Sequence, residues 1–353
     1  MRFGLDGAQS LLRDTVAQLA RQDAPLERVR RIAEAEGVAE HRSVYAELGE
    51  AGVTGLLVPE EHGGAGLGLL EAAIAAQELG AAATPASVHA SCVLAPLLLH
   101  ACGSQAQRAE WLGGIASGDA LVAVATRGID ERGGRLVGVA PEVADADLAD
   151  VFLVVAGEKL YLAPAKAGGI DVAPLLLVDR TRRLGAVRFD LAVAGLERLP
   201  GPIAPELLER VVAASRVALA ADALGACYRA IQLAVDYAKQ REQFGRVIGS
   251  FQAVKHLCAE MIADTDPIQS FLWHAAHAWD REEADAPRLA ALLKAHVAEV
   301  GAEVASKATQ VFGGMGFTWE CEVHWCYQRI GYARQVLGVP EELRDEAVPA
   351  LVS

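Results

Sequence analysis

The chain has 353 residues and a formal net charge of −14, from 32 Lys and Arg against 46 Asp and Glu. This acidity, without any Lys/Arg-rich run, argues against nucleic acid and anionic membrane surfaces as partners. The length exceeds the usual size of one hydrophobic core, so we expect two or three packed subdomains. Because aromatic residues make up only 5% while Ala and Leu dominate, helices are favoured over an all-β fold.

The cysteines and the N-terminus indicate a compartment. The six cysteines form no Cys-x-x-Cys pair and no zinc-type spacing. The first 25 residues mix charged and apolar side chains instead of forming a signal peptide. We also find no run of about 18 uncharged apolar residues. We therefore expect a cytoplasmic protein with reduced thiols, no membrane span and no metal site.

The first third of the chain predicts helices. Leu11, Leu12, Val16 and Leu19 recur at helical spacing, as one buried helix face requires. The segment Leu57 to Leu67 contains a proline and three glycines, which indicates a loop. Further helices are expected at Arg28–Glu36, His41–Gly52, Leu69–Leu79, Val93–Ala101 and Ser104–Gly118. We predict an N-terminal helical domain over residues 1–119.

The middle of the chain changes character. Short β-rich runs are separated by Gly, Asp and Pro, at Leu121–Ala125, Val151–Val155, Lys159–Leu162 and Leu175–Val178. They predict a small β domain over residues 120–200. A domain of this length is close to the size at which a core becomes marginal, so we expect it to depend on packing against its neighbours.

Long helical patterns return after residue 200. They are expected at Glu206–Lys239, Phe251–Asp280, Ala286–Phe312 and Cys321–Val336. Four long helices with short connections predict a C-terminal bundle over residues 201–353. The residues after Pro340 are expected to form only a short tail.

A polar cluster interrupts the apolar period of these helices at Arg241, Phe244 and Gly245. The period resumes at Phe251, so residues 244–250 are predicted to form a turn between two packed helices. At this turn the Arg241 guanidinium has the geometry to hold a phosphate by a bidentate contact. The alternative is that Arg241 caps a helix C-terminus and that the glycines merely end helices.

This stretch resembles the signature of the acyl-CoA dehydrogenase family, an Arg-x-x-Phe-Gly segment followed by Ile and then by a Phe-Gln pair. The segment QVFGGMGF, which begins at Gln310, is similar to the family's Gln-x-x-Gly-Gly-x-Gly-aromatic motif. The resemblance implies a mostly α fold with a small β domain, and a FAD shared between subunits. It implies that the cofactor-binding residues are Arg241, Gln243, Phe244, Gln252, Gln310, Gly313 and Gly314.

The middle domain departs from the family pattern. The resemblance implies a Thr-Glu-Pro strand end, a Gly-Ser-Asp loop and a Trp-x-Thr segment around the flavin ring. VAVATRGIDERGG stands where the first two are expected, and EKLYLAPA stands where the third is expected. We therefore expect this chain to lack a complete flavin-ring pocket.

The catalytic base is also missing. Dehydrogenation of a thioester needs a base for the α proton, and the family places a glutamate at one of two positions. Counting from Gly314 puts the commoner position at Leu337, and counting back from Arg241 puts the other at Ser215. Leucine cannot accept a proton, and a serine without an adjacent base is a poor substitute. Carboxylates that remain alternatives for a relocated base are Asp222, Glu242, Glu320 and Glu322.

The histidines and the late aromatic residues carry weaker signals. His62 lies in a glycine-containing loop, and His256, His296 and His324 lie on predicted helices without a partner at the spacing of a metal site or catalytic triad. We expect such histidines to be surface or satisfied core residues. Packing in the core is predicted for three aromatic residues that follow the glycine motif, Trp319, Trp325 and Tyr327.

These features together favour a subunit without its own base. The segments GGMGFTWE and DRTRR and the short middle domain resemble the actinobacterial heterotetrameric (α2β2) acyl-CoA dehydrogenases of steroid side-chain degradation. The resemblance implies a paralogous partner that carries the glutamate, an acyl-CoA substrate such as a steroid side-chain CoA, and electron-transfer flavoprotein as acceptor. The alternatives are a homomeric enzyme with a relocated base such as Asp222, or a non-enzymatic scaffold that kept the fold.

Overall fold

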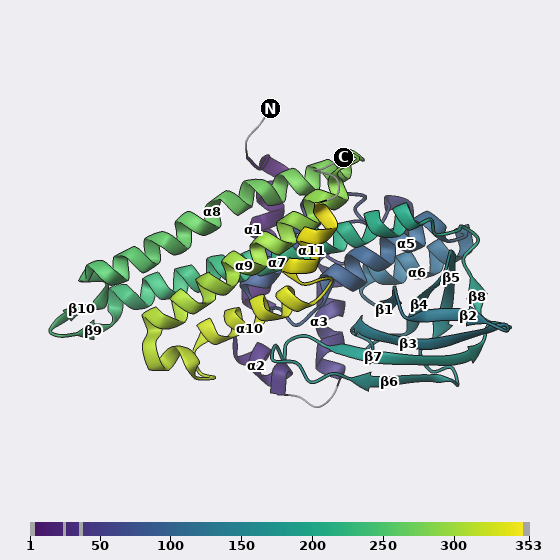
Figure 1. Cartoon of the computed structure of the whole chain (residues 1–353), viewed down its shortest axis with the longest axis horizontal. Helices are drawn as coiled ribbons and strands as arrows, with labels where there is room; N and C mark the ends of the chain where they lie inside the picture. The colour runs from purple at the N-terminus through teal and green to yellow at the C-terminus, as the bar shows by residue number, and fades with distance from the viewer. Residues whose placement is uncertain (1–3, 24–25, 35–37, 349–353) are drawn as a thin grey trace. The chain divides into compact units, whose positions relative to one another are not determined.

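The computed structural model describes residues 4–23, 26–34 and 38–348. Helices occupy both ends of the described chain, and eight strands lie between Val122 and Arg198 (Figure 1). This arrangement confirms the predicted mostly α fold with a small β portion. The chain forms two compact units. We call Met1–Val29, Ala73–Thr84 and Arg216–Ser353 the bundle unit, and Arg30–Ala72 with Pro85–Ser215 the sheet unit. The predicted domain boundaries after residues 119 and 200 stay predictions.

The helical elements before the strands agree closely with the predicted segments. They are α1 Gly7–Asp23, α2 Leu26–Glu34, α3 Ala39–Glu50, η1 Glu60–His62, α4 Leu69–Ala81, the π-helix η2 His89–Leu94, α5 Ala95–Cys102 and α6 Gln105–Ser117. The limits of α6 follow from local sequence. Ser104 and Gln107 form a capping box at its start, and Gly118 ends it with φ 77°.

The strands form two four-stranded sheets in the sheet unit. They are β1 Val122–Ala125, β2 Ile129–Arg132, β3 Arg135–Ala144, β4 Val151–Ala156, β5 Lys159–Pro164, β6 Ile170–Pro174, β7 Leu184–Ala192 and β8 Glu197–Arg198. One sheet has the order β1-β4-β5-β8 and the other β2-β3-β7-β6. The pairing of β1 with β4 is parallel, and the other pairs in these sheets are antiparallel.

One of the four predicted strands is wrong. Leu175–Val178 forms a loop, because the β6–β7 ladder ends where Pro174 pairs with Gly185. Leu176 is 94% exposed in that loop. Five strands of the two sheets, β2, β3, β6, β7 and β8, were not predicted from the sequence. In β2, β3 and β6, charged and small residues obscure the apolar alternation that marks a strand.

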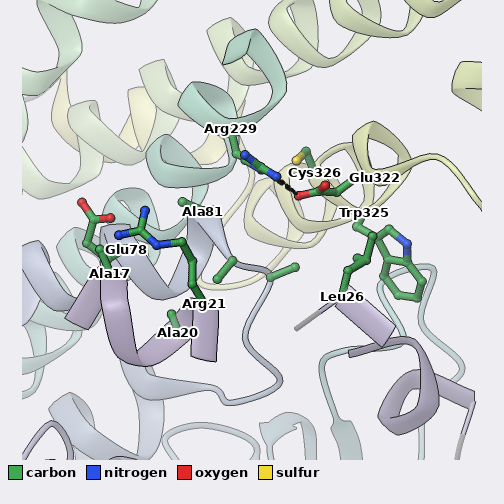
Figure 2. Close-up of a pocket in the computed structure, with 12 residues that line it drawn as sticks. Ala17, Ala20, Arg21, Leu26, Glu78, Ala81, Arg229, Glu322, Trp325 and Cys326 are labelled. Atoms are coloured by element: carbon green, nitrogen blue, oxygen red, sulfur yellow. Dashed lines mark hydrogen bonds and ion pairs between the residues drawn. The ribbon is translucent and has the colours of Figure 1, made fainter. Parts of the chain in front are cut away.

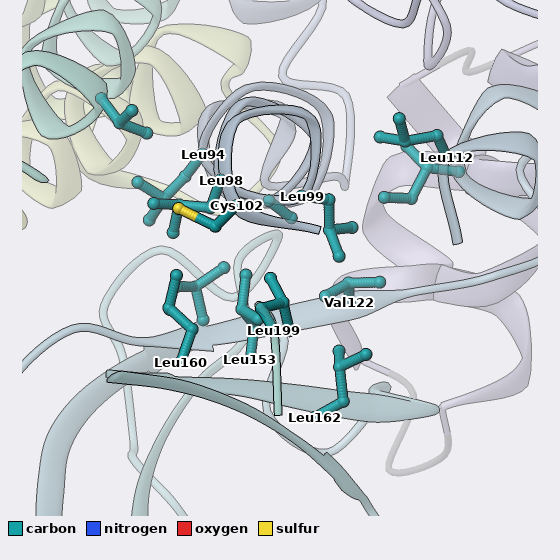
Figure 3. Close-up of a cluster of buried hydrophobic side chains, with 14 of the residues drawn as sticks. Leu94, Leu98, Leu99, Cys102, Leu112, Val122, Leu153, Leu160, Leu162 and Leu199 are labelled. Carbon is teal, nitrogen blue, oxygen red and sulfur yellow. The ribbon is translucent and has the colours of Figure 1, made fainter. Parts of the chain in front are cut away.

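Two apolar cores hold the sheet unit together. The first joins η2, α5 and α6 to one face of the β1-β4-β5-β8 sheet (Figure 3), through Leu94, Leu98, Leu99, Leu112, Val122, Leu153, Leu160 and Leu162. The second lies between the two sheets, where the Phe152 and Phe189 rings meet edge to face with centroids 5.6 Å apart. Because β4 faces both cores, all of its side chains are buried.

The C-terminal helices confirm the predicted bundle within one or two residues at each end. They are α7 Pro205–Gln240, α8 Gln252–Asp280, α9 Ala286–Phe312 and α10 Glu322–Gln335, with 3-10 turns η3 Ile248–Ser250 and η4 Gly313–Phe317. By length and composition α7 is apolar enough to cross a membrane, although 83% of its most apolar window is buried inside the protein.

The predicted C-terminal tail is wrong, because residues Pro340–Ala347 form helix α11. Pro340 suits the first turn of a helix, where its missing N–H has no intrahelical acceptor. Leu343 packs against Ala291 and Ala295 of α9, and Arg344 forms an ion pair with Glu299 of the same helix. Ion pairs of Glu346 with Arg216 and of Glu341 with Arg334 also connect α11 to the bundle unit.

A buried polar network lies in the sheet unit. Asp145, just after β3, accepts hydrogen bonds from the Tyr45 hydroxyl and from Ser87 Oγ, the latter at 3.1 Å. Burial raises the pKa of Asp145 to about 6. Burial, with the nearby positive charge of Arg183, lowers the pKa of His41 to about 4. Folding thus disfavours both the carboxylate and the imidazolium.

The two shifts have opposite effects on stability. The raised pKa of Asp145 makes the folded state less stable as pH rises from about 4 to 6, and the lowered pKa of His41 makes it more stable as pH rises from about 4 to 6.5. Each contribution amounts to roughly 3 kcal/mol, so they nearly cancel in the wild type.

In Asp145→Asn only the His41 contribution remains. We therefore expect the free energy of unfolding of this variant to increase by about 3 kcal/mol between pH 4 and 6.5, whereas that of the wild type changes little. His41→Gln should show the opposite slope. Urea unfolding of the three proteins at several pH values in this range measures the effect. Identical pH slopes in all three would contradict the assignment.

Candidate functional site

The turn predicted around Phe244 is a β-hairpin at the junction of α7 and α8 in the bundle unit (Figure 1). β9 Glu242–Gln243 and β10 Arg246–Val247 pair antiparallel. Phe244 and Gly245 join them with φ values of 55° and 76°. Two positive φ values in a two-residue loop match a type I′ turn, whose twist suits a hairpin. The tight turn leaves the Phe244 side chain 91% exposed.

Arg241 connects the end of α7 to this hairpin. Its backbone N–H donates to the Tyr237 carbonyl, and its own carbonyl accepts from Ile248 N–H, each at 2.8 Å. The backbone is thus fixed from both sides, while the side chain is exposed to solvent. Gly249 is needed here for space, because a Cβ atom would lie 2.8 Å from the Ala238 carbonyl oxygen.

Gln252 opens α8 and is also exposed. Phe251 at the N-cap position gives no side-chain cap, and the first turn of α8 contains no acidic residue. The first N–H groups of a helix lack intrahelical acceptors and favour an anion nearby. The Gln252 amide contacts His256 Nε2 at 3.1 Å, which orients it along the helix surface.

The second motif ends α9. Gln310 lies in its last turn and is exposed. Gly313 ends the helix with φ 63° and ψ −141°, a conformation that only glycine adopts readily. Gly314 has an ordinary φ, and nothing lies within 4 Å of the position of its missing Cβ. Among the described residues, therefore, no contact requires a glycine at position 314, and its backbone is open to an external group.

Both motifs lie at the same end of the bundle unit. The Tyr237 ring of α7 stacks on Phe312 of α9 with centroids 4.4 Å apart, and the Tyr237 hydroxyl contacts Met315 Sδ at 3.9 Å. Tyr237 precedes Arg241 by about one helical turn, and Phe312 follows Gln310 by two residues. The structure therefore brings together two segments that are about seventy residues apart in the sequence.

These residues fit a dinucleotide that approaches from outside the chain. Arg241, Gln243, Gln252 and Gln310 all expose donor groups to solvent. A guanidinium and three amides suit phosphate oxygens and the polar edge of a base. None of these four side chains lines either of the two cavities found in the described part of the bundle unit.

Neither predicted base position carries an acid. Leu337 lies in the turn between α10 and α11 with φ 62°, followed by Gly338 with φ 105°. Two cations hold this strained turn. Arg216 Nε donates to the Leu337 carbonyl at 3.1 Å, and the buried ammonium of Lys294 donates to the Gly338 carbonyl. The backbone conformation at position 337 is thus tightly specified although its side chain has no acid–base chemistry.

Ser215, the other predicted position, is fully buried in the sheet unit. Its Oγ donates to the His89 carbonyl at 2.7 Å. His89 opens the π-helix η2, where the wider hydrogen-bond spacing changes which carbonyl groups are satisfied within the helix. The Ser215 hydroxyl therefore has a structural hydrogen-bond partner.

Asp222 is buried between helices of the bundle unit. Its two carboxylate oxygens lie 3.2 and 3.3 Å from Arg329 Nη1, and Arg329 Nη2 donates to the Thr84 carbonyl at 3.1 Å. The exposed fractions of the Asp222 and Arg329 side chains are 2% and 0%. Asp222 therefore serves as the counter-ion of a buried arginine, which gives its carboxylate a structural role.

The other candidate carboxylates lie elsewhere. Glu322 borders a cavity of about 220 Å³ in the bundle unit, where its carboxylate accepts a hydrogen bond from Arg229 Nε at 2.6 Å (Figure 2). Glu242 and Glu320 are exposed. None of the three combines burial with a free carboxylate, the usual requirements for a strong general base.

The aromatic and metal predictions have mixed outcomes. Trp325 is buried, as predicted, whereas Trp319 and Tyr327 are about half exposed, so the prediction that they are core residues is wrong. Their exposure follows from positions in the η4–α10 connection and on the outer face of α10. Within residues 4–23, 26–34 and 38–348, no three His, Cys, Asp or Glu side chains gather as a metal site requires.

Sequence reasoning missed Arg216, Lys294 and Arg329. A usable signal existed for Lys294, because Ala290, Ala291 and Ala298 of the same helix face are buried around it. A charged residue on an apolar helix face indicates a buried partner.

Comparison with known proteins identifies the family. Models of the acyl-CoA dehydrogenase N-terminal domain and C-terminal domain match residues 6–119 and 206–347. Acyl-CoA dehydrogenase IpdE2 of Mycobacterium tuberculosis is 32% identical over 336 residues, which cover 95% of this chain and 94% of the relative. The chain belongs to the acyl-CoA dehydrogenase family, which confirms the resemblance drawn from its motifs.

Solved structures agree with this assignment. A variant of the Tcur3481-Tcur3483 steroid ACAD is 26% identical, with a TM-score of 0.87 and 98% of both chains covered. Butyryl-CoA dehydrogenase from Megasphaera elsdenii shares the fold with a TM-score of 0.87, at 20% identity and full coverage of both chains. An acyl-CoA dehydrogenase complexed with FAD from Bacillus anthracis has a TM-score of 0.88 at 20% identity, covering 99% of this chain and 67% of that one.

The role of Asp222 is testable without any ligand. We expect Asp222→Asn to lower the free energy of unfolding by about 3–5 kcal/mol, because it leaves the Arg329 charge buried without its partner. The double variant Asp222→Leu with Arg329→Met should recover much of this loss, since it removes both charges. Urea unfolding measures all three proteins, with the partly exposed Glu322→Gln as control. An Asp222→Asn protein as stable as the wild type would contradict the structural role.

Proposed function

We propose that this chain is the non-catalytic subunit of a FAD-dependent acyl-CoA dehydrogenase. It supplies the half of a shared FAD site that holds the pyrophosphate and adenine, and a paralogous partner supplies the flavin-ring pocket and the catalytic glutamate. The observation that carries the proposal is a contrast within the bundle unit. Arg241, Gln252 and Gln310 match the family motifs and are exposed. Position 337 holds a leucine, in a turn whose backbone carbonyls accept hydrogen bonds from Arg216 and Lys294.

The chemistry explains why a partner is needed. Oxidation of an acyl-CoA between its α and β carbons requires a base for the α proton, and FAD, when bound, accepts the hydride from the β carbon. In this chain Leu337 and Ser215 provide no base, and Asp222 is paired with Arg329. The contribution of the chain is therefore to bind and orient the cofactor through Arg241 and the three glutamines.

The comparisons support a heteromeric assembly. The steroid ACAD that resembles this chain over 98% of its length has a name that joins two proteins, Tcur3481 and Tcur3483. We propose the same organisation here, as a cytoplasmic α2β2 heterotetramer that oxidises an acyl-CoA, with a steroid side-chain CoA as the candidate substrate. Electron-transfer flavoprotein is the proposed acceptor.

The first test is the visible flavin spectrum of the chain purified alone and after co-expression with a paralogous acyl-CoA dehydrogenase chain from the same organism that carries the catalytic glutamate. We expect a colourless protein alone and a yellow heteromer with one FAD per pair of unlike chains, because each half-site is incomplete by itself. Native mass spectrometry gives the stoichiometry. A yellow homo-oligomer with one FAD per chain, able to reduce a dye acceptor with an acyl-CoA, would refute the proposal.

The second test addresses the proposed phosphate contact directly. In the heteromer, Arg241→Ala should weaken FAD binding about 10-fold to 100-fold, as expected for loss of a charge-assisted hydrogen bond of about 1.5–3 kcal/mol. Flavin content after dialysis measures the effect. Arg281→Ala, at the other end of α8 and also exposed, is the matched control. If both variants retain FAD equally, the scaffold alternative gains support.

A further inference from the structure

A second arginine, Arg246, lies on the returning strand of the hairpin. Its guanidinium carbon is 4.1 Å from the centroid of the Phe251 ring. The same ring packs edge to face against Phe244, with centroids 6.0 Å apart. Phe251, the N-cap residue of α8, therefore anchors both the tip and the second strand of the hairpin to the start of this helix.

The register of the hairpin sets which side chains share a face. Arg246 pairs directly with Gln243. Paired residues project from the same face of a ladder and side chains alternate along a strand, so Arg241, two residues before Gln243, projects from this face too. The hydrogen bond from Ile248 N–H to the Arg241 carbonyl extends the pairing by one step and supports this alternation.

The carboxylate of the hairpin does not neutralise this face. Glu242 pairs with Val247, and the alternation places it on the opposite face. Among the residues that the structure describes, neither Arg241 nor Arg246 forms an ion pair with a carboxylate, and both side chains are exposed. In a chain of net charge −14, the hairpin thus presents two unneutralised guanidinium groups on one face.

The contact with Phe251 prepares Arg246 for an anion. A guanidinium that lies over a ring is held by the attraction between its charge and the ring face, while its N–H groups remain available at the edge. Those N–H groups form a planar fork that matches two phosphate oxygens. Because the side chain is already ordered, less conformational entropy is lost when an anion binds.

We propose that Arg246 is a second phosphate-binding residue, which together with Arg241 holds the two phosphates of a dinucleotide pyrophosphate against this face. The inference rests on the proposed function, since the pyrophosphate is that of FAD. It adds a binding residue outside the set that the motifs indicate, and it assigns Phe251 as the residue that positions Arg246.

The test measures binding of ADP, which carries the pyrophosphate and adenine without the flavin, to the full-length chain by isothermal titration calorimetry. We expect Arg246→Gln to weaken ADP binding about tenfold, similarly to Arg241→Gln, because each removes one charge-assisted contact. Arg246→Lys should lie between, since it keeps the charge but loses the planar fork. Arg281→Gln, which removes an exposed arginine at the far end of α8, should bind ADP as the wild type does.

A double-mutant cycle separates positioning from folding. Phe251→Leu should weaken ADP binding several-fold, and in the Arg246→Gln background it should have little further effect, because the ring acts through Arg246. Unchanged circular dichroism and thermal unfolding of each variant verify that the hairpin region still folds. Fully additive effects of the two substitutions would overturn the positioning role of Phe251.

The outcomes distinguish this inference from the proposed function. If Arg241→Gln weakens ADP binding and Arg246→Gln does not, the inference fails while the half-site remains supported. If neither variant changes ADP binding, the inference fails, and the flavin content of the heteromer with Arg241→Ala decides the proposed function. A wild-type chain that binds no ADP at millimolar concentration also overturns the inference, and the flavin content of the heteromer then decides the proposed function by itself.

Discussion

The bundle unit depends on one buried ion pair, that between Asp222 and Arg329. The pair lies where two helices touch backbone to backbone. A Cβ atom on Gly80 would lie 2.0 Å from the Asp222 carbonyl oxygen, and one on Gly225 would lie 1.8 Å from that of Gln77. The two charges therefore lie beside a helix contact that has no room for a side chain at Gly80 or Gly225. Arg329 also donates a hydrogen bond to the carbonyl of Thr84, the last residue of the segment Ala73–Thr84. Removing either charge would leave the other buried without its counter-charge.

This ion pair changes the interpretation of the candidate site. A buried aspartate near the expected base position suggests a relocated base when only the sequence is known, since burial raises carboxylate pKa values and activates them. The structure shows a buried cation beside both of its oxygens. The same packing that buries Asp222 thus gives its carboxylate a structural role as the counter-ion of Arg329.

The chain also retains a strained turn at a position where it has no acid. Leu337 adopts a left-handed backbone conformation that leucine disfavours, held by Arg216 and by the buried Lys294. Strain of this kind persists only where surrounding contacts specify it. By contrast, the polar side chains of the hairpin and the backbone at Gly314 are exposed to solvent. The turn at Leu337 is therefore held by contacts within the chain, whereas the hairpin and the end of α9 present exposed polar groups.

The sequence by itself determined the family, the helices and the motif residues at the hairpin and at the end of α9. Helical periodicity and short motifs are local properties, so they survive without knowledge of the fold. Five strands of the two sheets and α11 were not predicted, because their apolar positions become recognisable only against the surfaces that bury them. Only the tertiary structure decided what each polar group contacts. Asp222 and Arg329 are 107 residues apart, and Ser215 and His89 are 126 apart. Such pairs form because packing removes both groups from water, and no local spacing in the sequence records that event.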